Sequence, residues 1–244
     1  IGNMKKLINI VLFMSLSLVA DNEISVTQSG NSATIDLEQQ GGSNLIGGTS
    51  AETGSMTALD LDGVSMILDI NQIGASNVFR SDAIDGDNFT GFFEFTGDSN
   101  VFDILMDSTG LIDSDYVNMN INVTGSSNTF DLAVAEDDDA SYLDLDWIIT
   151  GGSNAFDFDI DYANAINYVD VNGSSNTINF SGSGYAGTTS ADSGYFYLDL
   201  DGSSNTLDIT QSSTLARDYI KLITNTSNSN ICITQNDQGT STSC

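Results

Sequence analysis

The chain has 244 residues, a formal net charge of −29 and neither proline nor histidine. So acidic a surface repels nucleic acids and anionic membranes, and the absence of histidine excludes a Ser-His-Asp triad and any zinc or haem site that needs imidazole. The two cysteines, Cys232 and Cys244, are too few for a thiolate metal site or a disulfide framework. We therefore expect no metal, no cofactor and no nucleic-acid partner.

The first recognisable element is a targeting segment. From Met4, the basic residues Lys5 and Lys6 precede an apolar stretch over residues 7–18, and Ala20 ends it. This pattern is typical of a secretory signal peptide, and the stretch is too short to span a bilayer. No later stretch is apolar enough to span one either. We expect a secreted bacterial protein, extracellular or at the cell surface, without membrane insertion.

The signal segment divides the chain into three parts. Residues 1–20 are the signal peptide with its upstream residues, residues 21–237 form one repeat domain, and residues 238–244 form a polar tail. The repeat domain carries the rest of the sequence signal.

One strand–turn–strand unit recurs along the repeat domain. Its turn reads Gly-x-Ser-Asn, and the second and fourth residues on either side of the turn are apolar, as in Leu198 and Leu200 before Gly202, and Leu207 and Ile209 after it. A period of two places these residues on one face of a strand, whereas a helix would scatter them. The residues between them are mostly acidic, amide or threonine. The pattern predicts β-strands throughout, in agreement with the absence of proline.

Two series of turn glycines set the repeat length. The unit is a half-repeat of about eleven residues, and two half-repeats make one rung, which predicts about eight or nine rungs. The first series consists of Gly30, Gly74, Gly97, Gly125, Gly151, Gly173 and Gly202. The second, about midway between them, begins at Gly41, Gly63 and Gly86.

A single unit has one apolar face and cannot stand alone, so the units must stack. Parallel stacking gives a two-sheet β-solenoid, and antiparallel pairing gives a meander sandwich or barrel. Gly-x-Ser-Asn is longer than the usual two-residue hairpin turn, and like residues form columns only in parallel stacking. We predict an all-β, two-sheet parallel β-solenoid.

The turn residues have two expected roles. Glycine allows a positive φ at the corner. Asparagine has the inward parity, so its amide can donate to a carbonyl of the next rung and form a ladder. The simpler reading is that Gly and Asn favour turns, which explains the residue types and leaves their fixed spacing unexplained. The ladder candidates are Asn100, Asn128, Asn154, Asn176 and Asn205, with Asn44 and Asn77 earlier in the chain.

The N-terminal third carries the more specific pattern Gln-x-Gly-x-x-Asn. Two full copies stand at Gln39, Gly41 and Asn44 and at Gln72, Gly74 and Asn77, and a degenerate copy stands at Gln28 and Gly30. Over about residues 23–80 the chain resembles the curlin repeat, whose units stack into bacterial amyloid fibres. Farther on, aliphatic residues or Thr replace the inward Gln.

The resemblance implies secretion through a dedicated outer-membrane pore, nucleated self-assembly at the cell surface, and a role in biofilm matrix and adhesion. The implied partners are further copies of the chain, the pore and a nucleator. The main alternative is a soluble, monomeric surface adhesin or carbohydrate-binding protein on the same scaffold, with an ice-binding protein a weaker one. Capping of the solenoid ends distinguishes the fibre from the monomer.

The abundant aspartates can be interpreted in two ways: as a solvated acidic surface or as calcium ligands. Asp103, Asp131, Asp157 and Asp208, with Asn179 between the last two, occupy one outward position, where stacking places neighbours about 5 Å apart. In water each adjacent pair repels by about 1 kcal/mol, which burial of the apolar faces outweighs. The acidic clusters at Asp82, Asp85 and Asp87 and at residues 136–139 match no known calcium loop.

Two expectations remain. Alternating Asp offers many carboxylate pairs and singles out none for glycoside hydrolysis, so we do not expect an enzyme. Cys232 and Cys244 are candidates for a terminal disulfide, because the secreted compartment permits one, with two free thiols as the alternative.

Overall fold

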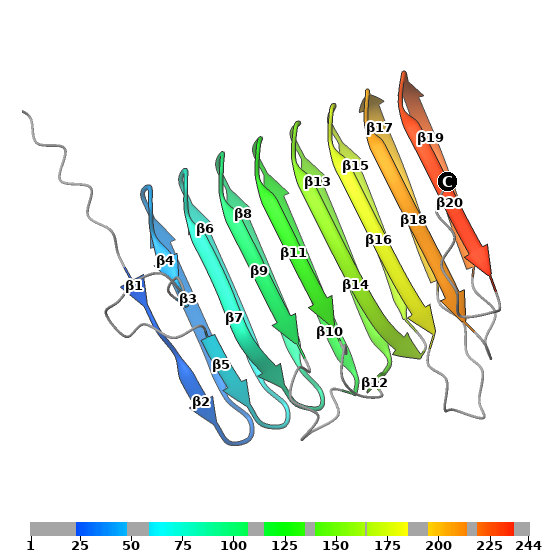
Figure 1. Cartoon of the computed structure of the whole chain (residues 1–244). Coiled ribbons are helices and arrows are strands. Elements are labelled where there is room, and N and C mark those ends of the chain that lie inside the picture. Colours follow the sequence, from blue (N-terminus) through cyan, green and yellow to red (C-terminus); the bar gives the residue numbers. More distant parts are fainter. Residues whose placement is uncertain are drawn as a thin grey trace, which may run out of the picture.

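The computed structural model describes residues 23–47, 59–106, 115–134, 140–163, 165–184, 195–213 and 219–236. These residues form twenty β-strands and no helix, and every strand pair is parallel. The strands build two facing sheets that run the length of an elongated stack (Figure 1). The chain is therefore a two-sheet parallel β-solenoid, which confirms the fold predicted from the alternating pattern.

The larger sheet has twelve strands and the smaller sheet has eight. The larger sheet contains β1 (Glu23–Ile24), β2 (Thr27–Ser29), β4 (Leu45–Ile46), β5 (Leu59–Asp62), β7 (Val78–Asp85), β9 (Val101–Met106), β11 (Thr129–Val134), β12 (Ala140–Ser141), β14 (Ala155–Ala163), β16 (Thr177–Gly184), β18 (Thr206–Ser213) and β20 (Asn230–Asn236). The smaller sheet contains β3 (Thr34–Gln40), β6 (Ile67–Ile73), β8 (Thr90–Thr96), β10 (Val117–Thr124), β13 (Leu143–Thr150), β15 (Ile166–Asn172), β17 (Tyr195–Ser203) and β19 (Tyr219–Ser227).

Each regular rung is one strand of the smaller sheet, a Gly-x-Ser-Asn turn and one strand of the larger sheet, as in β8 and β9. The smaller sheet stacks eight strands, one per rung, and the rung count differs only slightly from the eight or nine expected. At the N-terminal end of the larger sheet, short strands such as β4 and β5 replace continuous ones. Residues 48–58 separate β4 from β5 and lie outside the described residues, so the repeat spacing is interrupted there.

The apolar core lies between the two sheets. On β10, Met119, Ile121 and Val123 are buried and alternate with more exposed polar residues, as the period of two requires. The parallel register turns each inward position into a column. Phe102 and Phe130 of one such column stack with ring centroids 4.4 Å apart. Each fully buried apolar side chain contributes about 1.5–3 kcal/mol, so the continuous core stabilises rungs that would not fold singly.

Candidate functional site

The Gly-x-Ser-Asn turns stack into a column along one edge of the solenoid, and the first position must be glycine. Gly125 has φ of 141°, and a Cβ there would lie 1.9 Å from the carbonyl oxygen of Gly97. A side chain is thus excluded both by the backbone conformation and by the rung beneath. The same close approach recurs at Gly74, Gly97, Gly151, Gly173 and Gly202.

The structure corrects the phase of the two glycine series at the N-terminal end. Gly74 stacks on Gly41, because its Cβ would meet the Gly41 carbonyl oxygen at 1.7 Å. Gly63 instead stacks on Gly30 at the opposite edge, with a corresponding distance of 2.1 Å. The assignment of Gly30 to the Gly74 series is therefore wrong, and so is that of Gly41 to the second series. The longer spacing around residues 48–58 shifts the repeat, so counting from a fixed period exchanges the two edges.

The third turn position also has an unusual backbone, which the sequence reading missed. Ser99 has φ of 59° and Ser127 has φ of 60°, both in the left-handed region. A non-glycine residue pays about 1 kcal/mol or more for this conformation. The signal in the sequence is that the third position of these turns is always serine. The same conformation occurs at Ser43, Ser76, Ser153, Ser175 and Ser204.

The turn asparagines are 0–1% exposed and form a continuous ladder. The backbone N–H of each donates to the side-chain oxygen of the next, as from Asn100 to Asn128 at 2.9 Å. In three rungs the side-chain amide also donates to a glycine carbonyl of the preceding rung, as from Asn154 to Gly125 at 3.1 Å. The ladder joins Asn44, Asn77, Asn100, Asn128, Asn154, Asn176 and Asn205, and Ser229 accepts from Asn205 in the last rung.

Two of the three curlin-type glutamines meet. The Gln72 side-chain amide donates to the Gln39 side-chain oxygen at 2.9 Å, and both residues are buried. Gln28 lies on β2 in the other sheet, away from this pair. Phe95 follows Gln72 in the same column, so the glutamine ladder ends after two rungs.

The aspartate column of the larger sheet forms in the predicted register, with Asp103, Asp131 and Asp157 on adjacent strands. Arg80 precedes them and contacts the Asp103 carboxylate at 3.1 Å. Burial, and then the charges of the neighbouring aspartates, raise the pKa of Asp131.

Within the described ranges no three potential metal-ligating side chains are placed to hold an ion. The side chains of Asp82 and of residues 136–139 lie outside what the structure describes.

Cys232 is 8% exposed and is disulfide-bonded. The only other cysteine of the chain is Cys244, which lies outside the described residues.

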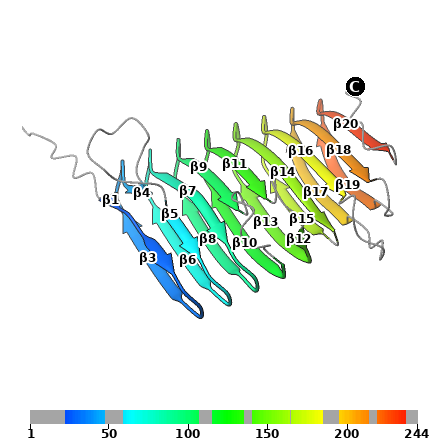
Figure 2. The ribbon, with the colours of Figure 1, turned by 60° about the horizontal axis from the view of Figure 1, so that its bottom comes forward.

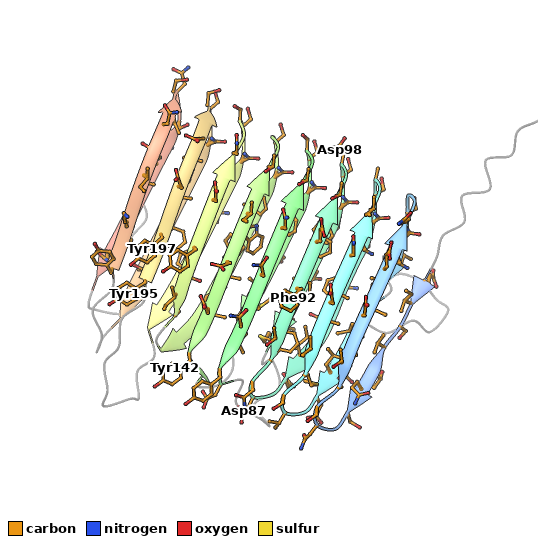
Figure 3. The ribbon with its side chains drawn as sticks, turned by 180° about the vertical axis from the view of Figure 1, so that it is seen from behind. Asp87, Phe92, Asp98, Tyr142, Tyr195 and Tyr197 are labelled. Atoms are coloured by element: carbon orange, nitrogen blue, oxygen red, sulfur yellow. The ribbon has the colours of Figure 1, made fainter. Side chains whose placement is uncertain are left out.

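The outer face of the smaller sheet carries a groove of about 550 Å³ between two columns of side chains, from β10 to β19. One wall includes Tyr168 and Tyr197, whose rings stack with centroids 4.7 Å apart, and the other includes Ile148 and Asp170. Figure 3 shows this face, with Tyr195 and Tyr197 close together. Sequence reading missed the groove, because its walls come from strands that are neighbours only after stacking.

Both ends of the solenoid expose core positions. At the N-terminal end, Ile35 and Leu37 of β3 are only partly buried against the core, and Ile220 and Leu222 of β19 are so at the other end. In the part of the chain that the structure describes, no strand pairs with the outer edges of β3, β19 or β20 (Figure 2). Among the described residues, the outer edges of β3 and β19 therefore carry backbone groups that no strand pairs, beside partly buried apolar side chains.

These features define the class of protein: a two-sheet parallel β-solenoid with buried Asn and Gln ladders. No family model, curated protein or solved structure matches the chain. Among the described residues, no helix is long and apolar enough to cross a membrane.

Proposed function

We propose that this chain is a secreted structural protein that stacks head to tail into extracellular, curli-like fibres for biofilm matrix and adhesion. The observation that carries the proposal is that, among the described residues, no strand pairs with the outer edge of the stack at either end, so the ends of neighbouring copies can pair. Such a heterologous contact does not close on itself and grows a filament. The curlin-like units of residues 23–80 support the same reading, including export through an outer-membrane pore and growth from a nucleator.

The register of the smaller sheet predicts how two copies meet. Following the strand pairs from β3 to β19 places Leu37 and Leu222 in one inward column, and Ile35 and Ile220 in another. When β19 of one copy pairs with β3 of the next, these residues stack as they do between rungs. The junction then repeats the geometry of the solenoid interior.

The larger sheet and the charges agree with this register. Ile231 of β20 lies in the column of Ile24 of β1, so both sheets can continue together. On the outer face, Lys221 shares its column with Asp36. At the junction the ammonium group therefore lies next to a carboxylate of the next copy.

Salt concentration should control assembly. Six apolar side chains go from partly to fully buried at each junction, contributing about 1 kcal/mol each from the area still exposed. Association costs about 4–15 kcal/mol, so apolar contact and backbone pairing together leave a small surplus. Without Lys5 and Lys6 the net charge of −29 becomes −31 for the mature chain, and the resulting repulsion between chains acts on that surplus and is screened by salt.

The test follows the mature chain, residues 21–244, by sedimentation and electron microscopy across a salt series. We expect monomers at low salt and unbranched filaments, one solenoid in width, as salt or divalent cation is added. A protein that stays monomeric for days at high concentration in every condition would overturn the proposal and favour the soluble adhesin.

Zero-length carbodiimide cross-linking tests the register separately. Without its signal segment the chain keeps a single lysine, Lys221, so peptides cross-linked through a lysine side chain are simple to assign. In filaments we expect an intermolecular amide between Lys221 and Asp36, absent from monomers and from the Lys221→Arg and Asp36→Asn variants. Filaments in which Lys221 is cross-linked to other carboxylates would refute this register, although the proposal that the chain forms filaments would still hold.

A further inference from the structure

We propose that the groove on the outer face of the smaller sheet binds a linear polysaccharide whose sugars carry free amino groups. The groove crosses β10, β13, β15, β17 and β19, a length of roughly 19 Å at one rung per strand spacing. Its long axis follows the solenoid axis. An occupant must therefore be narrow and extended, and it must repeat along its length as the rungs do.

Exposed apolar groups line the groove, although the outward positions of this fold are otherwise mostly polar. Tyr168 is 45% exposed, Ile148 is 44% and Ile223 is 49%. Tyr168 stacks on Tyr197 with one ring face, and its other face is turned toward β13, where the register places Asp146. Because the stacked rings face along the solenoid axis, it is their exposed edges that line the groove and offer apolar surface to the C–H groups of a sugar lying along it.

The charges of the groove select a cation. Asp146, Asp170 and Asp199 line it, against the single ammonium of Lys221. Asp170 and Asp199 are register partners on adjacent strands, so their carboxylates are close and repel. Burial and the charges of Asp199 and Asp201 raise the pKa of Asp170. A protonated amine between these carboxylates relieves the repulsion, whereas an acidic polysaccharide or a nucleic acid would add to it.

Lys221 closes one end of the groove. Its Nζ lies 5.9 Å from the centre of the Tyr197 ring, so the ammonium covers the C-terminal side of the tyrosine pair. The amino groups of the occupant are therefore expected at the β13–β17 portion, away from Lys221.

An extended peptide fits this surface less well. The backbone groups of β13, β15 and β17 are used in pairing with their neighbours within the sheet. A peptide lying across the face would therefore find no strand edge to extend, and its own amides would stay unpaired. Sugar hydroxyls and amines can instead be satisfied by the aspartate side chains and water.

The test compares three β-1,4-linked hexasaccharides by titration calorimetry with monomeric protein at low salt and about pH 6, where the amines of the probe are protonated. The probes are the hexamers of glucosamine, N-acetylglucosamine and glucose. We expect the glucosamine hexamer to bind about tenfold or more tightly than either neutral one. Equal affinity for all three would overturn the amine preference, and no binding of any would overturn the site.

Variants distinguish specific binding in the groove from nonspecific electrostatic attraction of a cationic sugar to an acidic protein. Asp170→Asn with Asp199→Asn should weaken glucosamine-hexamer binding by about tenfold, and Tyr168→Ser with Tyr197→Ser should weaken all binding similarly. The control is Asp131→Asn with Asp157→Asn, which removes the same charge from the other sheet and should leave affinity within about twofold. If the control weakens binding as much as the groove variants, the interaction is nonspecific and the proposal fails. Circular dichroism confirms that each variant is folded.

Discussion

The backbone N–H of Asn77 donates to the side-chain oxygen of Asn100, 2.8 Å away and one rung along the stack. Both residues are buried, so the bond replaces water that cannot reach the turn. Repeated in every rung, this contact satisfies a backbone donor at the point where the chain leaves one sheet for the other. The ladder thus determines where each rung turns as well as how tightly the rungs hold together.

Replacing Asn128 with Ala should destabilise the solenoid by about 1–3 kcal/mol. The substitution removes the acceptor of the Asn100 N–H and leaves that buried donor unpaired. The measurement is the denaturant midpoint followed by circular dichroism. Asn118→Ala on β10 is the matched control, because Asn118 is exposed, and it should change the midpoint little. Equal effects of the two variants would contradict a stabilising role for the ladder.

Two substitutions in one turn should differ sharply in their cost to stability. Gly125→Ala places a Cβ within 1.9 Å of the Gly97 carbonyl oxygen and should cost about 3 kcal/mol or more, since the backbone must shift. Ser127→Gly relieves a left-handed serine and should be neutral within about 1 kcal/mol. Thermal unfolding of both variants checks this contrast. A tolerated alanine at position 125 would show that the rungs are packed less closely than the structure has them.

A charged side chain at a core position of β19, the terminal strand of the smaller sheet, should block assembly without unfolding the monomer. Leu222 is partly buried at the end of the stack, so Lys at this position can still reach water in the monomer. A second copy would bury the ammonium without a partner, which costs several kcal/mol. Sedimentation of Leu222→Lys in high salt should show monomers only. Asn225→Lys, with the same charge on an exposed position of the same strand, should still assemble; its failure to do so would assign the effect to charge alone.

Stability should rise on mild acidification. The pKa of Asp131 is raised in the folded state by burial and then by neighbouring aspartates, so the folded state binds a proton more readily than the unfolded state. Stability therefore increases as pH falls through the raised pKa and levels off below the ordinary value of 3.8. Asp131→Asn should raise neutral-pH stability by less than about 1 kcal/mol, because the site is partly exposed and screened. It should also flatten the pH dependence measured by denaturant unfolding, and an unchanged pH dependence in this variant would contradict the prediction.

The period-two alternation from Leu198 to Ile209 was sufficient to predict strands, their inward faces and parallel stacking. Burial of one face is a local property of alternation, and a turn of constant composition leaves few ways to stack it. The inward parity of Asn100 likewise followed from counting along one chain segment. These features depend on residues that are close in sequence.

Only the tertiary structure decided which residues become neighbours between rungs. Gly30 and Gly41 exchanged edges because the spacing changes around residues 48–58, which a fixed period does not anticipate. The stacking of Tyr168 on Tyr197 and the shared column of Asp36 and Lys221 follow from the cumulative register of several unequal rungs. In a parallel sheet a shift of one residue turns a side chain to the opposite face, so these contacts exist only once every strand pair has its register.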